Sequence, residues 1–307
     1  PVFADIEDQT FCIDPDGVNK QITQKTRAII AVNLFGHPAQ LARLRELADH
    51  HGLYLIEDNA QAPLGMEYGK HCGTVGHIGI FSLNYHKHIH TGEGGMCVTD
   101  DEDLAHRLQL IRNHGENLVE SEEILDITNL VGLNLRMTEM SAAVGIVQLE
   151  HIDTHVQKRE QIAMSLSQGT QDLEGWVPPV VRQKCRHNYY CWVAKYDPKI
   201  VGISLSLFSE ALNAEGFPNS VGYLPPLYKL PIFQKRIAIG QSGFPFSLTD
   251  HLYPNGLCPI TESLHDGRVL LFEPCAWDIG EAEMEQLVTA IRKVHHQVGA
   301  LTSLEKD

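Results

Sequence analysis

The residues LYLIEDNAQA, at positions 53–62, combine the two features that decide the fold: a short apolar run and a polar segment directly after it. Four apolar residues bounded by Gly52 and by polar residues are typical of a buried β-strand. In an open α/β sheet, ligands bind beyond the carboxyl ends of the strands. The polar residues from Glu57 to Gln61 are therefore the first candidates for a functional site.

Strand-like and helix-like patterns alternate on both sides of this run. Short apolar runs occupy residues 28–32, 78–81 and 95–98. Leucine, isoleucine and alanine at helical spacing predict helices over 39–51 and 104–111. Strands that alternate with helices at short intervals indicate an α/β fold with a mostly parallel sheet. The chain also begins with a strand-like segment, Val2 to Ala4.

The second half of the chain has a different pattern. Helical periodicity from Met137 to Leu166 predicts one or two helices that lead out of the first domain. We then expect a strand at 188–194 and helices at 205–214 and 284–298, which together form an α+β domain.

The segment 217–274 between these elements is rich in proline, glycine and tyrosine and is expected to be mostly loop. We therefore divide the chain into a large domain, residues 1–150, and a second part, residues 151–307. This second part holds the spine helix and the smaller C-terminal α+β domain.

The charge balance argues against polyanionic partners. With 24 Lys and Arg against 39 Asp and Glu, the formal net charge is −15, so nucleic acid and anionic membrane surfaces are disfavoured as partners. The seven cysteines have no CxxC spacing, and reduced thiols are expected. With no signal-like start and no apolar run of about 18 residues, the expected location is the cytoplasm.

A single lysine stands out in LNYHKHIHTGEGG, residues 83–95. Lys87 follows the apolar run at 78–81, and a desolvated lysine can form a Schiff base with a carbonyl. Asp58 follows the neighbouring run. Enzymes that use pyridoxal phosphate (PLP) need both groups: the lysine holds the aldehyde, and a carboxylate keeps the pyridine nitrogen protonated.

A metal site is the alternative interpretation of this segment. His86, His88 and His90 alternate, so in an extended chain they would lie on one face and could bind zinc. That interpretation leaves Lys87 and the glycine turn at 92–95 unexplained, and we predict no metal. Exposed histidines, or histidines that line a substrate pocket, explain the pattern better.

Several segments resemble, in order, the signatures of the DegT/StrS family of PLP-dependent sugar aminotransferases. They are IEDNAQA at 56–62, the stretch from FSLNYHKHIHTGEGG to IRNHG at 81–115, and GLNLRMTEMSAAVG at 132–145. The opening residues 1–18 and the segments VGYLPPLYKLPIF and CPITE are also similar to that family. The resemblance spans nearly the whole chain and implies the fold type I aminotransferase fold.

The resemblance also implies roles for five residues. Lys87 matches the lysine that holds PLP and relays the proton, and Asp58 matches the acid at the pyridine nitrogen. Gln61 matches a position beside the cofactor ring and its phenolic oxygen, and Ser82 matches a hydroxyl on the phosphate. Asn134 matches an asparagine that reaches the phosphate of the neighbouring subunit, so a homodimer with shared active sites is implied.

In the family, a further quarter of the large domain precedes the segment that matches Pro1. That part holds a glycine turn for the phosphate and an aromatic residue that stacks on the ring. Neither matches a residue of this sequence, so we expect the N-terminal part of the large domain to lie outside this chain.

The activity implied is transfer of an amino group from an amino acid, L-glutamate by the resemblance, to a keto sugar that is usually nucleotide-linked. The product would enter amino-sugar or surface polysaccharide biosynthesis. Three alternatives stay open: a keto-cyclitol as acceptor, a sugar dehydratase of the same family in which a histidine replaces the lysine, and a noncatalytic regulatory protein with the same fold.

Overall fold

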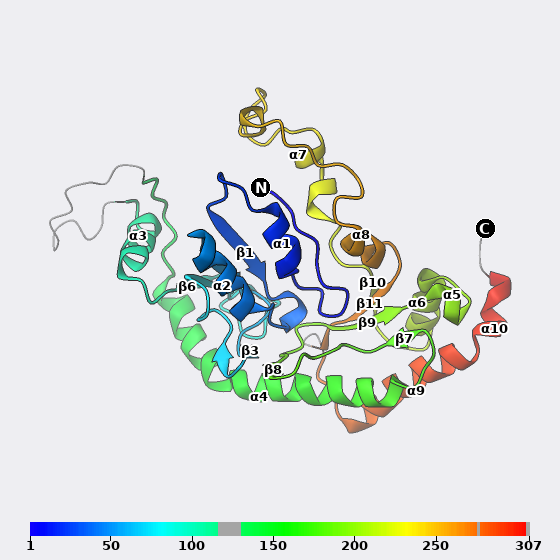
Figure 1. Ribbon diagram of the computed structural model, residues 1–307. Helices are drawn as coiled ribbons and strands as arrows, with labels where there is room; N and C mark the ends of the chain where they lie inside the picture. Colours follow the sequence, from blue (N-terminus) through cyan, green and yellow to red (C-terminus); the bar gives the residue numbers. More distant parts are fainter. Residues whose placement is uncertain (116–129, 275–276, 305–307) are drawn as a thin grey trace. The chain divides into compact units, whose positions relative to one another are not determined.

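A computed structural model describes residues 1–115, 130–274 and 277–304 of the chain (Figure 1). The chain forms two compact units. The parallel-sheet unit consists of Thr26–Gln157 and Lys184–Asn188, and the antiparallel-sheet unit consists of Pro1–Lys25, Lys158–Gln183 and Tyr189–Asp307. The predicted domains, 1–150 and 151–307, stay a prediction; the compact units differ from them in grouping the first 25 residues with the C-terminal part.

The parallel-sheet unit is built on four strands in the order β1-β2-β5-β6. The first three are parallel and β6 is antiparallel to β5, so the predicted mostly parallel sheet is confirmed. The main elements are β1 (Ala28–Val32), α2 (Leu41–His51), β2 (Tyr54–Asp58), β5 (Ile78–Ser82), β6 (Gly95–Val98) and α3 (Glu102–Arg112). All six lie within two residues of the ranges that the apolar pattern predicts.

The sheet is packed on one face. Ile29, Ala31 and Leu55 are buried, whereas the alternate residues Ile30 and Tyr54 are 60% and 50% exposed. Side chains alternate across a strand, and α2 covers the buried face through Leu41, Leu44 and Ala48. Gly52, with a φ of 64°, adopts the left-handed conformation that ends α2 and lets the chain enter β2.

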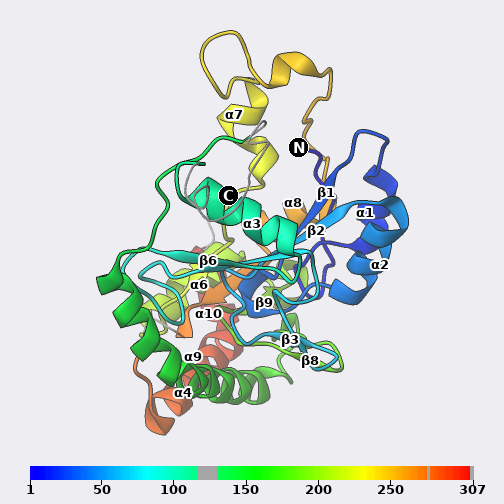
Figure 2. The same cartoon turned by 90° about the vertical axis from the view of Figure 1, so that its left-hand side faces the viewer.

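A single helix, α4 (Glu139–Thr170), contains the predicted spine (Figures 1 and 2). Its first half exposes apolar side chains, with Met140 at 80% and Ile146 at 61%. Its second half buries Ile162 and Leu166 in the core of the antiparallel-sheet unit.

The antiparallel-sheet unit has four strands in the order β10-β11-β9-β7, and every neighbouring pair is antiparallel. Its main elements are β7 (Trp176–Val177), β9 (Trp192–Tyr196), α6 (Leu205–Ala214), β10 (Ser220–Val221), β11 (Val269–Phe272) and α9 (Glu281–His296). The core is aromatic, with rings of Trp176, Tyr196 and Phe208 in contact at centroid distances of 5.1 and 5.6 Å.

Short elements complete both units. They are α1 (Pro15–Gln21), η1 (Leu34–Gly36), β3 (Met66–Glu67), β4 (Lys70–His71), β8 (Cys185–Arg186), α5 (Pro198–Val201), η2 (Leu227–Lys229), α7 (Pro231–Gln234), η3 (Phe246–Leu248), α8 (Pro259–His265), α10 (Val298–Leu301) and η5 (Thr302–Leu304).

Two local predictions were wrong. Val2 to Ala4 is not a strand; the start of the chain is held by the carboxylate of Asp5, which accepts hydrogen bonds from the backbone of Ile260 and Thr261. The strand expected from residue 188 begins only at Trp192, because Tyr189 has a φ of 52°.

The segment 217–274 is mostly irregular, as predicted, but the sequence pattern did not identify a strand within it. It contains β11, which pairs with both β9 and β10. The run VLLF at 269–272 is buried on both faces, so it lacks the alternation by which a half-buried strand is recognised.

Candidate active site

Two of the predicted site residues, Asp58 and Ser82, lie at the carboxyl ends of the neighbouring strands β2 and β5. Asp58 is the last residue of β2 and lies opposite Ile80 of β5. Ser82 is two residues beyond Ile80, so its side chain points to the same face of the sheet as those of Ile80 and Asp58. Both Asp58 and Ser82 are half-buried. The structure therefore brings these two residues to one edge and one face.

The two neighbouring carboxylates of β2 have different surroundings. Glu57 points to the packed face, is completely buried, and accepts hydrogen bonds from the backbone N–H of Gly73, Val75 and Gly76 at 2.5 to 2.8 Å. Asp58 points to the other face, where its Oδ1 accepts from the N–H of Ala60 at 3.0 Å. Glu57 is therefore held within the packed face, whereas Asp58 lies half-buried on the opposite face at the carboxyl end of β2.

Gln61 lies in the loop after β2 and is buried. Its Oε1 accepts a hydrogen bond of 2.7 Å from the N–H of Phe35, in the loop after β1. Phe35 has a φ of 58°, a strained conformation for a residue with a side chain, and the hydrogen bond to Gln61 helps to hold it.

Two buried asparagines extend this network. Asn33 donates to Asn59 Oδ1 at 2.6 Å and accepts from the N–H of Ala39 at 2.7 Å. Each asparagine is the first residue after a strand, which is the signal that could have identified them; the sequence interpretation did not assign them a role. They join the loops that follow β1 and β2.

Lys87 is half-buried in the loop after β5, and its backbone N–H donates to the carbonyl of Asn84 at 3.0 Å. Leu83 and Ile89, on either side of it, pack with Ile152 and Val156 of α4. The loop is closed by the backbone bond from Leu83 to Gly94, 2.8 Å long. Lys87 therefore lies between two residues of the loop that are buried against α4.

The three alternating histidines do not share one environment. His88 is buried, whereas His86 and His90 are exposed. Within residues 1–115, 130–274 and 277–304, no group of three or more His, Cys, Asp or Glu side chains is placed to hold a metal ion.

Asn134 is exposed and lies beside the end of α3, where it forms an isolated bridge with Asn113. Its Oδ1 accepts from the N–H of Arg136 at 3.4 Å. The predicted contact of Asn134 with a phosphate in a neighbouring subunit stays a prediction.

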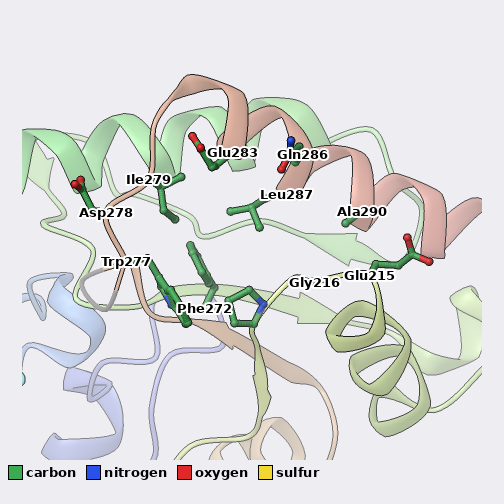
Figure 3. A pocket seen from close by; sticks show the side chains of 11 residues that line it. Glu215, Gly216, Phe272, Trp277, Asp278, Ile279, Glu283, Gln286, Leu287 and Ala290 are labelled. Atoms are coloured by element: carbon green, nitrogen blue, oxygen red, sulfur yellow. The ribbon is translucent and has the colours of Figure 1, made fainter.

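A separate cavity of about 410 Å³ lies in the antiparallel-sheet unit (Figure 3). Phe272, Trp277 and Leu287 are among the apolar residues around it. Two of its carboxylates already have cationic partners: Glu215 binds Lys293 at 2.7 Å, and Asp278 binds Lys158. None of the five predicted site residues lines this cavity.

The sequence has relatives among known protein families and curated proteins. Residues 1–269 match the sequence profile of the DegT/DnrJ/EryC1/StrS aminotransferase family. An L-glutamine:2-deoxy-scyllo-inosose aminotransferase of Streptoalloteichus tenebrarius is 33% identical over 313 residues, which cover 96% of this chain and 72% of that protein. An uncharacterized protein of Methanocaldococcus jannaschii is 33% identical over 256 residues, and the match covers 80% of this chain and 65% of that protein.

Solved structures agree with the sequence matches. The crystal structure of DesI in the presence of its TDP-sugar product superposes with a TM-score of 0.81 at 29% identity, and covers all of this chain and 72% of DesI. This likeness confirms the predicted fold type I aminotransferase fold. No helix of the described residues has the length and apolarity to cross a membrane. The profile match and the fold together show that the chain belongs to the DegT/DnrJ/EryC1/StrS aminotransferase family.

Proposed function

We propose that this protein is a PLP-dependent aminotransferase that moves an amino group from an amino acid to a keto sugar. One observation carries the proposal: Asp58 and Ser82 end neighbouring parallel strands on the same face, and Lys87 lies in the loop that follows Ser82. A lysine amine for the aldehyde and a carboxylate for the ring nitrogen are groups that PLP enzymes use, and the hydroxyl of Ser82 is a donor for the phosphate. Family membership supports the same chemistry.

The side chains at this edge fit PLP in their hydrogen-bonding chemistry. Ser82 Oγ accepts a hydrogen bond from the N–H of Asn84 at 3.3 Å, which leaves its hydroxyl hydrogen for a phosphate oxygen. Asp58, as a carboxylate, accepts only and suits the protonated ring nitrogen. Because Gln61 Oε1 accepts from Phe35, a contact with the phenolic oxygen of the ring would use the amide nitrogen of Gln61 as donor.

Each residue then has one task. PLP, when bound, supplies an aldehyde that attaches to amines and a ring that accepts electrons. Asp58 would hold the proton on the ring nitrogen, and Ser82 would orient the phosphate. Lys87 would hold the aldehyde and would act as the base and the acid that moves a proton at the substrate carbon.

The proposal also covers the whole protein, its assembly and its location. The chain spans 65% of the Methanocaldococcus jannaschii relative and 72% of the Streptoalloteichus tenebrarius relative. We include a homodimer with Asn134 reaching the partner's phosphate; the exposed apolar residues of α4, Met140 and Ile146 among them, support an interface there. A cytoplasmic location is part of the proposal.

The acceptor has two candidates. The DesI structure contains a TDP-sugar product, which supports a nucleotide-linked keto sugar. The name of the Streptoalloteichus tenebrarius relative supports a keto-cyclitol, with L-glutamine rather than L-glutamate as donor. Both donors therefore belong in the assay.

The test uses the full-length product of the source gene and its Lys87→Ala variant, with Lys70→Ala as the control because Lys70 is exposed on β4. PLP is trapped on the protein with borohydride and located by peptide mass spectrometry, and amine transfer is measured from both donors to a TDP-keto sugar and to a keto-cyclitol. We expect attachment at Lys87 in the wild type and in Lys70→Ala, and loss of attachment and transfer in Lys87→Ala.

Each alternative predicts a different result. A sugar dehydratase that depends on histidine would keep its turnover in Lys87→Ala. A noncatalytic regulatory protein would bind PLP but would not convert it to the amine form with either donor. Attachment at a lysine other than Lys87 would overturn the assignment of the site.

A further inference from the structure

Asn188 connects three loops of the parallel-sheet unit and is completely buried. Its N–H donates to the carbonyl of Gly36, in the loop after β1, at 3.2 Å. Its side-chain Nδ2 donates to the carbonyl of Pro63, in the loop after β2, at 2.6 Å. Its own carbonyl lies 3.4 Å from Nε2 of His88, in the loop after β5. One residue thus ties together the loops that follow three adjacent strands.

The contact with His88 has a defined direction. A carbonyl oxygen only accepts, so Nε2 of His88 must carry the hydrogen. His88 is buried, and it directly follows Lys87. Its neighbour Ile89 is buried against Ile152 and Val156 of α4. The chain on the C-terminal side of Lys87 is therefore fixed by one polar and one apolar contact.

The side chain of Asn188 acts here through its donor. Its Oδ1 is buried and accepts no hydrogen bond from the described residues, whereas Nδ2 makes the short bond to Pro63. An aspartate at this position would keep the shape and place an acceptor against the carbonyl of Pro63, which removes the bond and adds repulsion.

From this arrangement we propose that His88 and Asn188 are positioning residues that hold Lys87 at the carboxyl ends of β2 and β5. The inference rests on the proposed role of Lys87 as the PLP-binding lysine. His88 directly follows Lys87, so its contact with Asn188 restrains the backbone of the lysine. Asn188 in turn fixes the position of His88 relative to the loops after β1 and β2. Neither residue needs to touch the cofactor for this role.

The test compares two substitutions of His88 in the full-length protein. His88→Gln keeps an N–H donor near the position of Nε2, and His88→Leu keeps the volume without a donor. Asn188→Asp removes the Nδ2 donor, and His71→Leu is the control because His71 is an exposed residue of the same unit. For each variant, the affinities for PLP and for pyridoxamine phosphate, the trapping of PLP at Lys87 and the melting temperature are measured.

Pyridoxamine phosphate provides the readout that distinguishes positioning from general damage, because it has no aldehyde and cannot attach to lysine. We expect His88→Leu and Asn188→Asp to weaken PLP binding and slow attachment at Lys87 by roughly tenfold to a hundredfold, since misplaced reacting groups lose that much. Binding of pyridoxamine phosphate should change less than twofold. His88→Gln and His71→Leu should resemble the wild type.

The outcomes separate this inference from the proposed function. A wild-type protein that does not attach PLP at Lys87 overturns both. If the wild type attaches PLP and His88→Leu binds and attaches it equally well, only the positioning role is overturned. Equal losses for PLP and pyridoxamine phosphate, with a lowered melting temperature, would also overturn it, because they indicate a structural role alone. If Asn188→Asp does not fold, the two His88 variants decide whether the positioning role holds.

Discussion

Both sheets bury apolar residues, but they differ in what is buried around the ends of their strands. In the antiparallel-sheet unit, the strands enclose an aromatic core, and Trp192, Phe208 and Phe272 are almost completely buried. In the parallel-sheet unit, the carboxyl ends of the strands enclose polar residues, and Glu57, Asn59 and Asn188 have no exposed surface. The first arrangement derives its stability from removing apolar surface from water. The second depends on hydrogen bonds such as the three that Glu57 accepts, because an unpaired buried polar group is destabilising.

This difference separates the roles of the two regions. An apolar core tolerates small changes of shape as long as its volume is filled. A buried polar network holds each member in one geometry, which is what a catalytic lysine and carboxylate need. The comparison predicts that substitutions in the aromatic core change stability alone, whereas substitutions at the strand ends change stability and chemistry in different proportions.

The largest expected effect on stability is in the aromatic core. Leu212 is completely buried in α6, whereas Leu248 is 74% exposed. We expect Leu212→Ala to lower the free energy of unfolding by about 2–5 kcal/mol and Leu248→Ala by about 0.5 kcal/mol or less. Urea denaturation followed by circular dichroism measures both. Equal losses for the two variants would contradict the burial that defines this core.

Substitutions of the adjacent carboxylates Glu57 and Asp58 test whether stability and activity can be changed separately at the end of β2. Glu57→Gln replaces a carboxylate that accepts three backbone hydrogen bonds, and we expect a loss of roughly 1.5–3 kcal/mol in the free energy of unfolding. Asp58→Asn should change stability by less than about 1 kcal/mol and lower amine transfer by on the order of a hundredfold.

Denaturation and a transfer assay on the same two preparations decide this prediction. If Asp58→Asn kept full activity, the assignment of Asp58 to the ring nitrogen would be wrong. If Glu57→Gln lost activity with unchanged stability, the roles of the two carboxylates would have to be exchanged.

The smallest expected effect is the change of stability with pH. Burial lowers the pKa of His187 well below its ordinary value, and the neighbouring His37 lowers it further. Below about pH 6.5 the unfolded chain binds a proton at this histidine that the folded chain does not bind. The contribution of His187 to stability is therefore most favourable above that pH, falls by up to about 1.4 kcal/mol per pH unit below it, and levels off once the pH drops below the folded-state pKa.

His187→Gln should flatten this dependence between pH 6.5 and pH 5, and His71→Gln, at an exposed position, should leave it unchanged. Thermal denaturation across that range measures the slope. A wild-type protein whose stability does not change over the range would contradict a buried, neutral His187.

Much of the parallel-sheet unit could be predicted from local pattern. β1, β2, β5 and β6 coincide with short apolar runs, and Asp58 and Ser82 follow from the rule that ligands gather at the carboxyl ends of such strands. These elements are local: each is defined by fewer than about a dozen consecutive residues, so the sequence states their pattern directly.

Other features depend on residues far apart in the chain. β11 is central in its sheet and buried on both faces, so its sequence shows no alternation. Asn188 and His88 are separated by 100 positions. The opening residues join the antiparallel-sheet unit through Asp5 and the backbone of Ile260 and Thr261. No pattern within a short window identifies such pairs.

By itself, the sequence determined the class of fold, the positions of the strands of the parallel-sheet unit, and the residue types that follow them, because periodicity and composition act locally. The tertiary structure decided which of two adjacent carboxylates is buried with three backbone donors and which lies half-buried on the opposite face of the sheet. It also decided that a buried asparagine near the middle of the chain connects three loops. The physical reason is burial: a polar group excluded from water must find its partners in space, and only the folded chain places those partners.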